Sequence, residues 1–92
     1  MGAYVIANFT TLDQQKLKQY GAAAAETLAN YGGEYIAKGN FVELHGKTDF
    51  KTTVIIAFPD SEAANNWYHS EPYQQLIELR SQAMQAQFQL VG

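Results

Sequence analysis

Two short segments of this chain would have apolar side chains on both faces if they formed strands. These segments constrain the fold more than any other feature. Residues 3–9, AYVIANF, and residues 53–58, TVIIAF, are rich in residues that favour β-strands. Side chains of a strand point alternately to opposite faces, so neither segment has a clearly polar face. We expect both strands to lie in the middle of a sheet, covered on both sides.

The segment between these strands begins with a helical pattern over residues 11–31. Thr11 followed by Gln14 fits a capping box, and Asp13 is a rival N-cap. Gly32 suits the left-handed position that follows a helix. The apolar positions recur at intervals of three and four, which is the helical period; they are Leu17, Tyr20, Ala24, Leu28 and Tyr31.

Gly21 lies inside this helical pattern and is followed by four alanines, which predicts a smooth helix face pressed close to a sheet. After the helix, residues 33–38 and 41–45 have the pattern of two strand segments around a Gly-Asn turn. They form either a hairpin or one long strand broken by a bulge. Residues 46–52 are polar and are predicted to form a loop.

The C-terminal third predicts a helical region in two pieces and a final strand. Asp60 is placed to cap the first piece, and Ser70 before Glu71-Pro72 is placed to cap the second. In the second piece, helical spacing places Arg80 on the same face as four apolar or aromatic residues, which are Tyr73, Leu76, Ile77 and Met84. Residues 86–91 alternate apolar and glutamine side chains, which is typical of a half-exposed strand at a sheet edge.

The resulting order, β-α-β-β-α-β, predicts one α+β domain over residues 1–92 with the ferredoxin-like fold. Its four-stranded antiparallel sheet has the first and third strands in the middle, which are the two that are apolar on both faces. Both helical regions cover the same face. Because a large exposed apolar face is rare on a monomer, we expect the open face to pack against a second copy, forming a homodimer.

Composition excludes several functions. The net charge is −3 and the six lysine and arginine residues are dispersed, so we expect no nucleic-acid partner. The absence of cysteine excludes disulfides and thiolate chemistry. The apolar run at the N-terminus is too short to span a bilayer, so we expect no membrane partner and a cytoplasmic location.

The stretches YVIANF, YGGEYIAKG and IAFPDSEAANNWYHSEPYQQLIELR resemble the bacterial family called domain of unknown function 1330, in the dimeric α/β-barrel superfamily. The resemblance runs nearly end to end, although Asp13-Gln14 stands where the family often has Asp-Pro. It implies a ferredoxin-like subunit that pairs sheet to sheet as a dimeric α/β barrel. It implies no particular reaction, because the superfamily contains cofactor-free monooxygenases, haem-binding enzymes, lactone isomerases and ligand binders.

Arg80 is the only arginine of the chain, and helical spacing places it on an apolar stripe. One interpretation is an anion clamp in a pocket between the second helical region and the sheet, with aromatic walls. The alternative is structural: an ion pair inside the subunit, a cap on backbone carbonyls, or a packed stem with an exposed head. Candidate carboxylate partners are Glu26, Glu43 and Glu78, and the candidate ligand-binding residues are Arg80, Tyr73, Trp67, Tyr68 and Asn8.

His69 is the candidate general base for removing a proton next to a carbonyl group. Its alternative role is to interact with the last carbonyls of a helix. Asn8 is a polar residue in an apolar strand, placed either to orient a ligand or to be satisfied by backbone at the strand end. The two histidines, His45 and His69, lack metal-ligand spacing, so we expect no metal and no cofactor.

The sequence therefore predicts a small protein that binds a small organic molecule between helices and sheet, with an anion as one option. One alternative is a cofactor-independent enzyme acting on a carbonyl or phenolic compound, similar to an isomerase or a monooxygenase. Another is a non-catalytic homodimeric interaction module in which Arg80 is structural.

Overall fold

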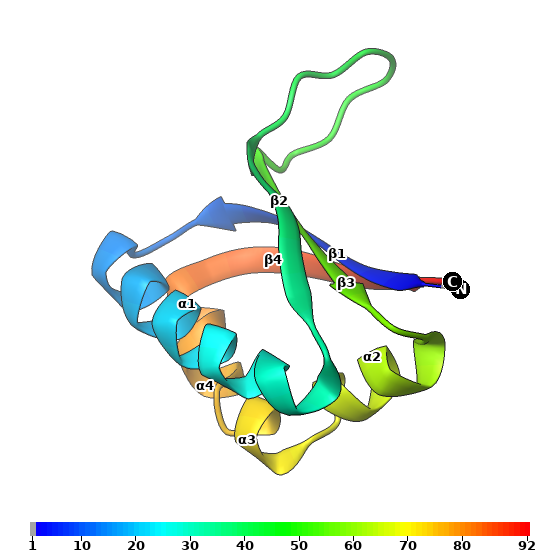
Figure 1. Cartoon of the computed structure of the whole chain (residues 1–92). Helices are drawn as coiled ribbons and strands as arrows, with labels where there is room; N and C mark the ends of the chain where they lie inside the picture. The colour runs from blue at the N-terminus through cyan, green and yellow to red at the C-terminus, as the bar shows by residue number, and fades with distance from the viewer. Residues whose placement is uncertain (1) are drawn as a thin grey trace.

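The computed structural model of the chain describes residues 2–92 (Figure 1). Its elements follow the order expected from the sequence, with the second helical region divided into three short helices. They are β1 (Ala3–Thr11), α1 (Gln14–Leu28), the 3-10 helix η1 (Ala29–Tyr31), β2 (Glu34–Asn40), β3 (Thr52–Phe58), α2 (Ser61–Tyr68), α3 (Glu71–Gln74), α4 (Ile77–Ala83) and β4 (Met84–Val91).

The four strands form one antiparallel sheet in the order β2-β3-β1-β4. The two strands that are apolar on both faces, β1 and β3, occupy the middle as predicted, and β4 lies at an edge. Ile6 pairs with Ile55 across the centre, and Ala7 pairs with Phe88 on the other side of β1. The helices all cover one face of this sheet (Figure 1).

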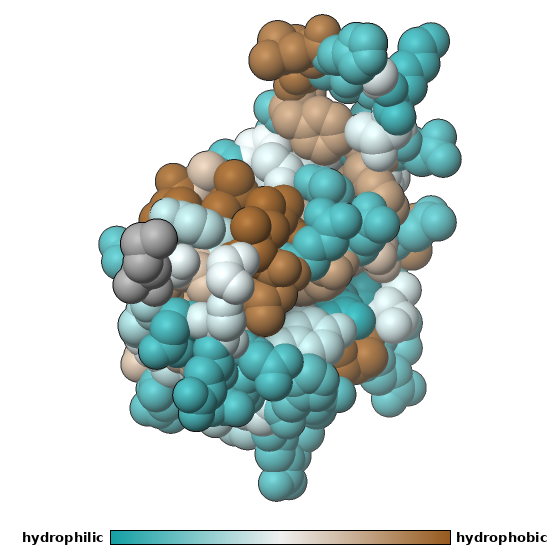
Figure 2. Space-filling view, turned by 90° about the vertical axis from the view of Figure 1, so that its right-hand side faces the viewer, coloured by the Kyte–Doolittle hydropathy of each residue, from teal (hydrophilic) through white to brown (hydrophobic). Residues whose placement is uncertain are grey.

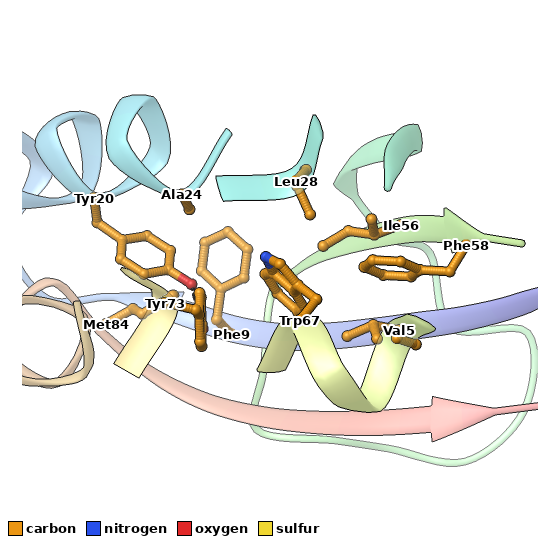
Figure 3. Close-up of a cluster of buried hydrophobic side chains, with 11 residues drawn as sticks. Val5, Phe9, Tyr20, Ala24, Leu28, Ile56, Phe58, Trp67, Tyr73 and Met84 are labelled. Carbon is orange, nitrogen blue, oxygen red and sulfur yellow. Dashed lines mark hydrogen bonds between the residues drawn. The ribbon is translucent and has the colours of Figure 1, made fainter. Parts of the chain in front are cut away.

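The core lies between the helices and the sheet. Along β1 the alternate side chains Val5, Ala7 and Phe9 are buried, because they face the helices. In β3 the buried residues are Ile56 and Phe58. Figure 3 shows the side chains of Val5, Phe9, Ile56 and Phe58 meeting those of the helices in one cluster. Its other members are Tyr20, Ala24, Leu28, Ala64, Trp67, Tyr73 and Met84.

Helix α1 begins and ends at polar and glycine signals in the sequence. The carboxylate of Asp13 accepts a hydrogen bond from the backbone N–H of Lys16 at 3.0 Å, so Asp13 is the N-cap. The capping-box prediction for Thr11 is wrong, because Thr11 still pairs with Met84 in the sheet. After η1, Gly32 adopts a left-handed conformation with φ of 71°, as predicted for a glycine that ends a helical segment.

The second strand segment predicted over residues 41–45 is absent; this stretch belongs to a projecting loop of residues 41–51 (Figure 1). Pairing with β3 stops at Asn40 and Thr52. Beyond that point the backbone N–H of Phe41 still donates to the carbonyl of Lys51 at 3.3 Å, and further along the loop the carboxylate of Glu43 accepts a hydrogen bond from the backbone N–H of Thr48 at 2.8 Å. The irregularity in β2 lies between Tyr35 and Ala37, earlier than the Gly-Asn turn where the sequence placed it.

The prediction that Gly21 presses against the sheet is wrong. A Cβ atom built at Gly21 meets nothing within 4 Å, and the residue borders a cavity. We therefore expect Gly21→Ala to raise the free energy of unfolding by about 1 kcal/mol, because alanine loses less backbone entropy in a helix and no neighbour obstructs its methyl group. Urea denaturation measures this change, and a destabilised variant would contradict the open space beside Gly21.

The break predicted near Ser70 is confirmed, and it separates α2 from α3. The sequence prediction placed Met84 on the same helical face as Tyr73, and this is wrong. Helix α4 ends at Ala83, and the extended backbone of Met84 begins β4. None of the helices among residues 2–92 is long and apolar enough to cross a bilayer.

The sheet face opposite the helices carries apolar groups in its centre. Ile6 and Ile55 point to this face and are only partly covered, and Tyr4 is exposed. The edge strand β4 contributes glutamines at positions 85, 87 and 89 to the same face. Figure 2 shows an apolar area bordered by polar residues, and apolar atoms at the end of the projecting loop. That loop exposes Val42 by 82% and Leu44 by 98%.

Candidate functional site

The helical break at Ser70 brings three aromatic side chains together. The Ser70 hydroxyl donates to the carbonyl of Trp67 at 2.7 Å and accepts from the N–H of Tyr73 at 3.4 Å, so it both ends α2 and caps α3. The rings of Trp67 and Tyr73 then lie 4.4 Å apart, and those of Tyr68 and Tyr73 lie 5.2 Å apart. Trp67 is 1% exposed and Tyr73 is 0% exposed, so these two residues form the buried part of the aromatic cluster.

Arg80, on α4, is joined to this aromatic cluster by hydrogen bonds. Its Nη1 donates to the hydroxyl of Tyr73 at 2.9 Å and to the hydroxyl of Tyr68 at 3.0 Å. The guanidinium carbon lies 4.6 Å from the ring centre of Phe88, a cation–π distance. The Tyr73 hydroxyl in turn contacts the hydroxyl of Tyr20 on α1 at 2.6 Å (Figure 3). One guanidinium and three phenols therefore form a connected polar network inside an aromatic environment.

Among the residues that the structure describes, no carboxylate balances the charge of Arg80. Within residues 2–92 the hydrogen bonds of the guanidinium go to phenol oxygens, and Glu26, Glu43 and Glu78 are exposed elsewhere. Burial alone would lower the pKa of Arg80, but the hydrogen bonds with Tyr73 and Tyr68 outweigh it and raise that pKa above its ordinary value. Arg80 is thus a permanent, half-buried cation with neutral partners.

Burial, the largest influence, raises the pKa of Tyr20 and the pKa of Tyr73. For Tyr20 the neighbouring Tyr73 adds to the increase, whereas the pKa of Tyr73 is lowered again by its hydrogen-bonded contacts with Tyr20 and Arg80. Both phenols therefore remain protonated in the folded protein at pH values where an unfolded chain ionises its tyrosines.

This difference predicts alkaline destabilisation. Above about pH 10 the unfolded state binds fewer protons than the folded state, so the free energy of unfolding falls as pH rises, while below that pH the contribution is fully present. Each buried phenol adds a slope of about 1.4 kcal/mol per pH unit. We expect urea denaturation at successive pH values to show a smaller slope for Tyr20→Phe than for the wild type. Equal slopes would contradict the buried state of Tyr20.

Two hollows flank the network. A groove of about 250 Å³ runs between α2 and the edge strand β4. Its walls include Tyr68 and His69 on the helix side and Phe88 and Leu90 on the strand side. A smaller cavity of about 80 Å³ lies under α1, lined among others by Phe9, Tyr20, Gly21, Tyr35, Val54 and Trp67. Phe88 borders both hollows, and Arg80 packs over its ring.

The predicted site residues are brought together only in part. Arg80, Tyr73, Trp67 and Tyr68 form the cluster described above. His69 lies at the groove with its ring centre 5.4 Å from that of Tyr68, and its Nδ1 is 3.0 Å from the carbonyl oxygen of Asn65 at the end of α2.

Asn8 is separated from the cluster. It pairs with Thr53 and Gln87 and points to the open face of the sheet, whereas Phe9 beside it points to the helices. A ligand bound between the helices and the sheet therefore does not reach the Asn8 side chain.

Three residues of the site were not among the sequence candidates. Tyr20 was assigned to the apolar stripe of α1, although a buried tyrosine hydroxyl requires a hydrogen-bond partner, and that requirement was the available signal. Phe88 was recognised only as part of an alternating strand. Tyr35 was interpreted as a core or interface aromatic residue, and no feature of the sequence placed it at the cavity under α1.

The element order, the antiparallel sheet and the helices on one face define a ferredoxin-like α+β domain. The chain belongs to the family described as domain of unknown function 1330, whose model matches residues 2–92. This confirms the family resemblance found in the sequence. No curated protein sequence matches the chain.

Several crystal structures share the fold. A protein of unknown function from Rhodopseudomonas palustris is 13% identical with a TM-score of 0.79, over 98% of this chain and 80% of that chain. SnoaB, a cofactor-independent oxygenase from Streptomyces nogalater, is 13% identical with a TM-score of 0.72, over 99% and 91%. A dimeric ferredoxin-like protein of unknown function from Thermobifida fusca is 14% identical with a TM-score of 0.68, over 100% and 91%. At these identities the likeness establishes the fold alone.

Proposed function

We propose that this protein is a small cytoplasmic homodimer that binds a small organic anion in the groove between α2 and β4. The observation that carries the proposal is the half-buried Arg80, whose hydrogen bonds within the described chain go to neutral phenols. A cation without a carboxylate partner favours an anion nearby, and the low-polarity walls strengthen that attraction. The guanidinium carbon lies within 6 Å of the ring centres of both Tyr68 and Phe88, which line the groove.

Tyr68 is the group that transmits this charge to the ligand. A guanidinium has donors and no acceptor, so the Tyr68 oxygen accepts from Arg80 and its own hydrogen is free to donate. Accepting from a cation polarises the phenol and makes it a stronger donor. A carboxylate in the groove would therefore receive one hydrogen bond from Tyr68, with its apolar part against Phe88 and Leu90.

A thermal-shift titration with benzoate tests this proposal, with benzyl alcohol as the uncharged control. A ligand at 100 times its dissociation constant stabilises by about 2.7 kcal/mol, which raises the melting temperature of a domain this size by roughly 10 °C or more. Tyr68→Phe keeps the ring and removes the donor, so we expect most of the benzoate shift to be lost. The proposal is wrong if benzoate gives no shift, or the same shift in Tyr68→Phe.

A second candidate function is cofactor-independent acid–base chemistry in the same groove. The observation that favours it is the placement of His69 beside Tyr68 at the groove wall, where an imidazole could take a proton next to a ligand carbonyl while Arg80 stabilises the enolate. The fold is shared with a cofactor-independent oxygenase. This activity predicts deuterium uptake by phenylpyruvate in D2O above the buffer rate, abolished in His69→Gln. Uptake at the buffer rate would leave only the binding function.

The homodimer is proposed through the open face of the sheet. Its centre carries Tyr4, Ile6 and Ile55, and its β4 border is glutamine-rich, an arrangement similar to interfaces with an apolar core and a polar rim. One structural neighbour is a dimeric protein. A non-catalytic interaction module would use the same face, and ligand binding in the groove is what distinguishes the two functions.

A further inference from the structure

The roles of donor and acceptor can be assigned to each hydroxyl of the polar network. This assignment identifies a second binding site. Arg80 only donates, so the Tyr73 oxygen accepts from it at 2.9 Å. Tyr73 is 0% exposed and borders neither hollow, and its hydroxyl contacts only Arg80 and Tyr20 within the described chain. A Tyr73 hydrogen turned away from Tyr20 would be buried without a partner, which is costly. Tyr73 therefore donates to Tyr20.

The same reasoning leaves one hydrogen at the end of the chain. The Tyr20 oxygen accepts from Tyr73 at 2.6 Å, so its own hydrogen is free. Tyr20 lines the cavity of about 80 Å³ under α1, whose other walls are mainly apolar and include Phe9, Val54 and Ile56. Tyr35 and Lys38 border the same cavity from the exposed edge strand β2. The cavity thus combines apolar walls with hydrogen-bond donors.

We propose that the cavity under α1 is a ligand site, distinct from the groove at β4, for a small apolar compound with one acceptor-only oxygen, that is, a small ketone or aldehyde. A carbonyl oxygen has two lone pairs and brings no hydrogen, so it matches a site whose terminal group is the Tyr20 donor. An alcohol brings a hydrogen that needs an acceptor of its own. Arg80 acts at a distance here, as a positioning residue that fixes the orientation of the Tyr73 and Tyr20 hydroxyls.

The cavity volume limits the size of the compound. An engineered cavity of about 150 Å³ in another protein holds benzene, so one of about 80 Å³ accommodates the carbonyl end of a compound of that size, with the remainder extending past Tyr35 and Lys38. Cyclopentanone is a suitable probe, and methylenecyclopentane is its control, because it has nearly the same shape and no oxygen acceptor.

NMR titration of the full chain with both compounds tests the proposal. We expect cyclopentanone to shift the amide signals of Gly21 and Ala24, which line the cavity, and to bind about threefold to tenfold more tightly than methylenecyclopentane. Tyr20→Phe should remove this preference, whereas Tyr31→Phe, which removes a phenol outside the network and outside this cavity, should leave it unchanged. Equal affinity for the two compounds, or no binding of cyclopentanone, overturns the proposal.

Infrared spectroscopy of the wild-type complex provides a test that does not depend on a variant folding. The carbonyl stretch of bound cyclopentanone should lie below its frequency in hexane, because the oxygen accepts a hydrogen bond. A stretch at the hexane frequency would show that no donor reaches the ketone and would overturn the proposal. Because benzoate is the probe for the groove and cyclopentanone for the cavity, failure at one site is distinguishable from failure at the other.

Discussion

Replacing Trp67 with alanine is expected to lower the free energy of unfolding by about 3–5 kcal/mol, the largest effect on stability of any change considered. Trp67 is 1% exposed, and its ring lies 5.4 Å from that of Phe58 and 4.4 Å from that of Tyr73. Its Nε1 donates to the Thr27 hydroxyl at 2.8 Å, which ties α2 to α1. Removing the ring leaves a large void, and the Thr27 hydroxyl loses the hydrogen bond that it accepts, although it still donates to the carbonyl of Ala24 at 2.6 Å. The loss is large because the total free energy of unfolding of a natural protein is only about 5–15 kcal/mol.

Urea denaturation at fixed protein concentration measures this loss. Two controls separate its causes: Trp67→Phe keeps much of the ring volume, and Thr27→Val removes only the hydrogen-bond partner. Each should cost less than Trp67→Ala, with Thr27→Val near 1–3 kcal/mol because it leaves a buried N–H unsatisfied. A Trp67→Ala variant within about 1 kcal/mol of the wild type would contradict the packing described for the core.

Ile55→Asp is expected to dissociate the proposed homodimer while leaving the subunit folded. Ile55 pairs with Ile6 at the centre of the open face, and its side chain points away from the helices. In a two-fold dimer the substitution buries two carboxylates in one interface, each without a partner. Since every 1.4 kcal/mol is a factor of ten, we expect the dimer dissociation constant to rise by at least about a hundredfold.

Analytical ultracentrifugation over a range of concentrations measures the dissociation constant. Ala25→Asp is a matched control, because it adds the same charge at an exposed position of α1. It should sediment as the wild type does, and circular dichroism should show folded subunits for both variants. A wild-type protein that remains monomeric at millimolar concentration, or an Ile55→Asp protein that remains dimeric, would exclude the open face as the interface.

The strands and helices were predictable where one physical cause dominated. β1 and β3 are apolar on both faces, and no position other than the middle of the sheet covers them adequately. The helix stops at Gly32 and Ser70 depend on local backbone and side-chain chemistry, which is encoded in a few neighbouring residues. The strand prediction for residues 41–45 failed although these residues favour strands individually. A strand also requires a partner, and β3 begins only at Thr52, which pairs with Asn40.

The candidate site was predictable only where its residues lie within about two helical turns of one another in the sequence. Arg80 and Tyr73 are seven residues apart, so helical spacing placed them together, and the kink at Ser70 added Tyr68. The contact between Tyr20 and Tyr73 joins residues 53 positions apart, and it depends on how α1 lies across the sheet. Asn8 was assigned to the site because sequence alternation defines two strand faces without indicating which one the helices cover.

We propose that the charge of Arg80 attracts the bound anion, and the chain permits a direct measurement of this effect. Arg80 is the only arginine, so protein labelled with nitrogen-15 arginine gives one guanidinium Nε signal. We expect benzoate to shift this signal in a saturable way, benzyl alcohol to leave it in place, and Tyr68→Phe to weaken the response. A signal that stays fixed through a full benzoate titration would exclude an anion bound near Arg80.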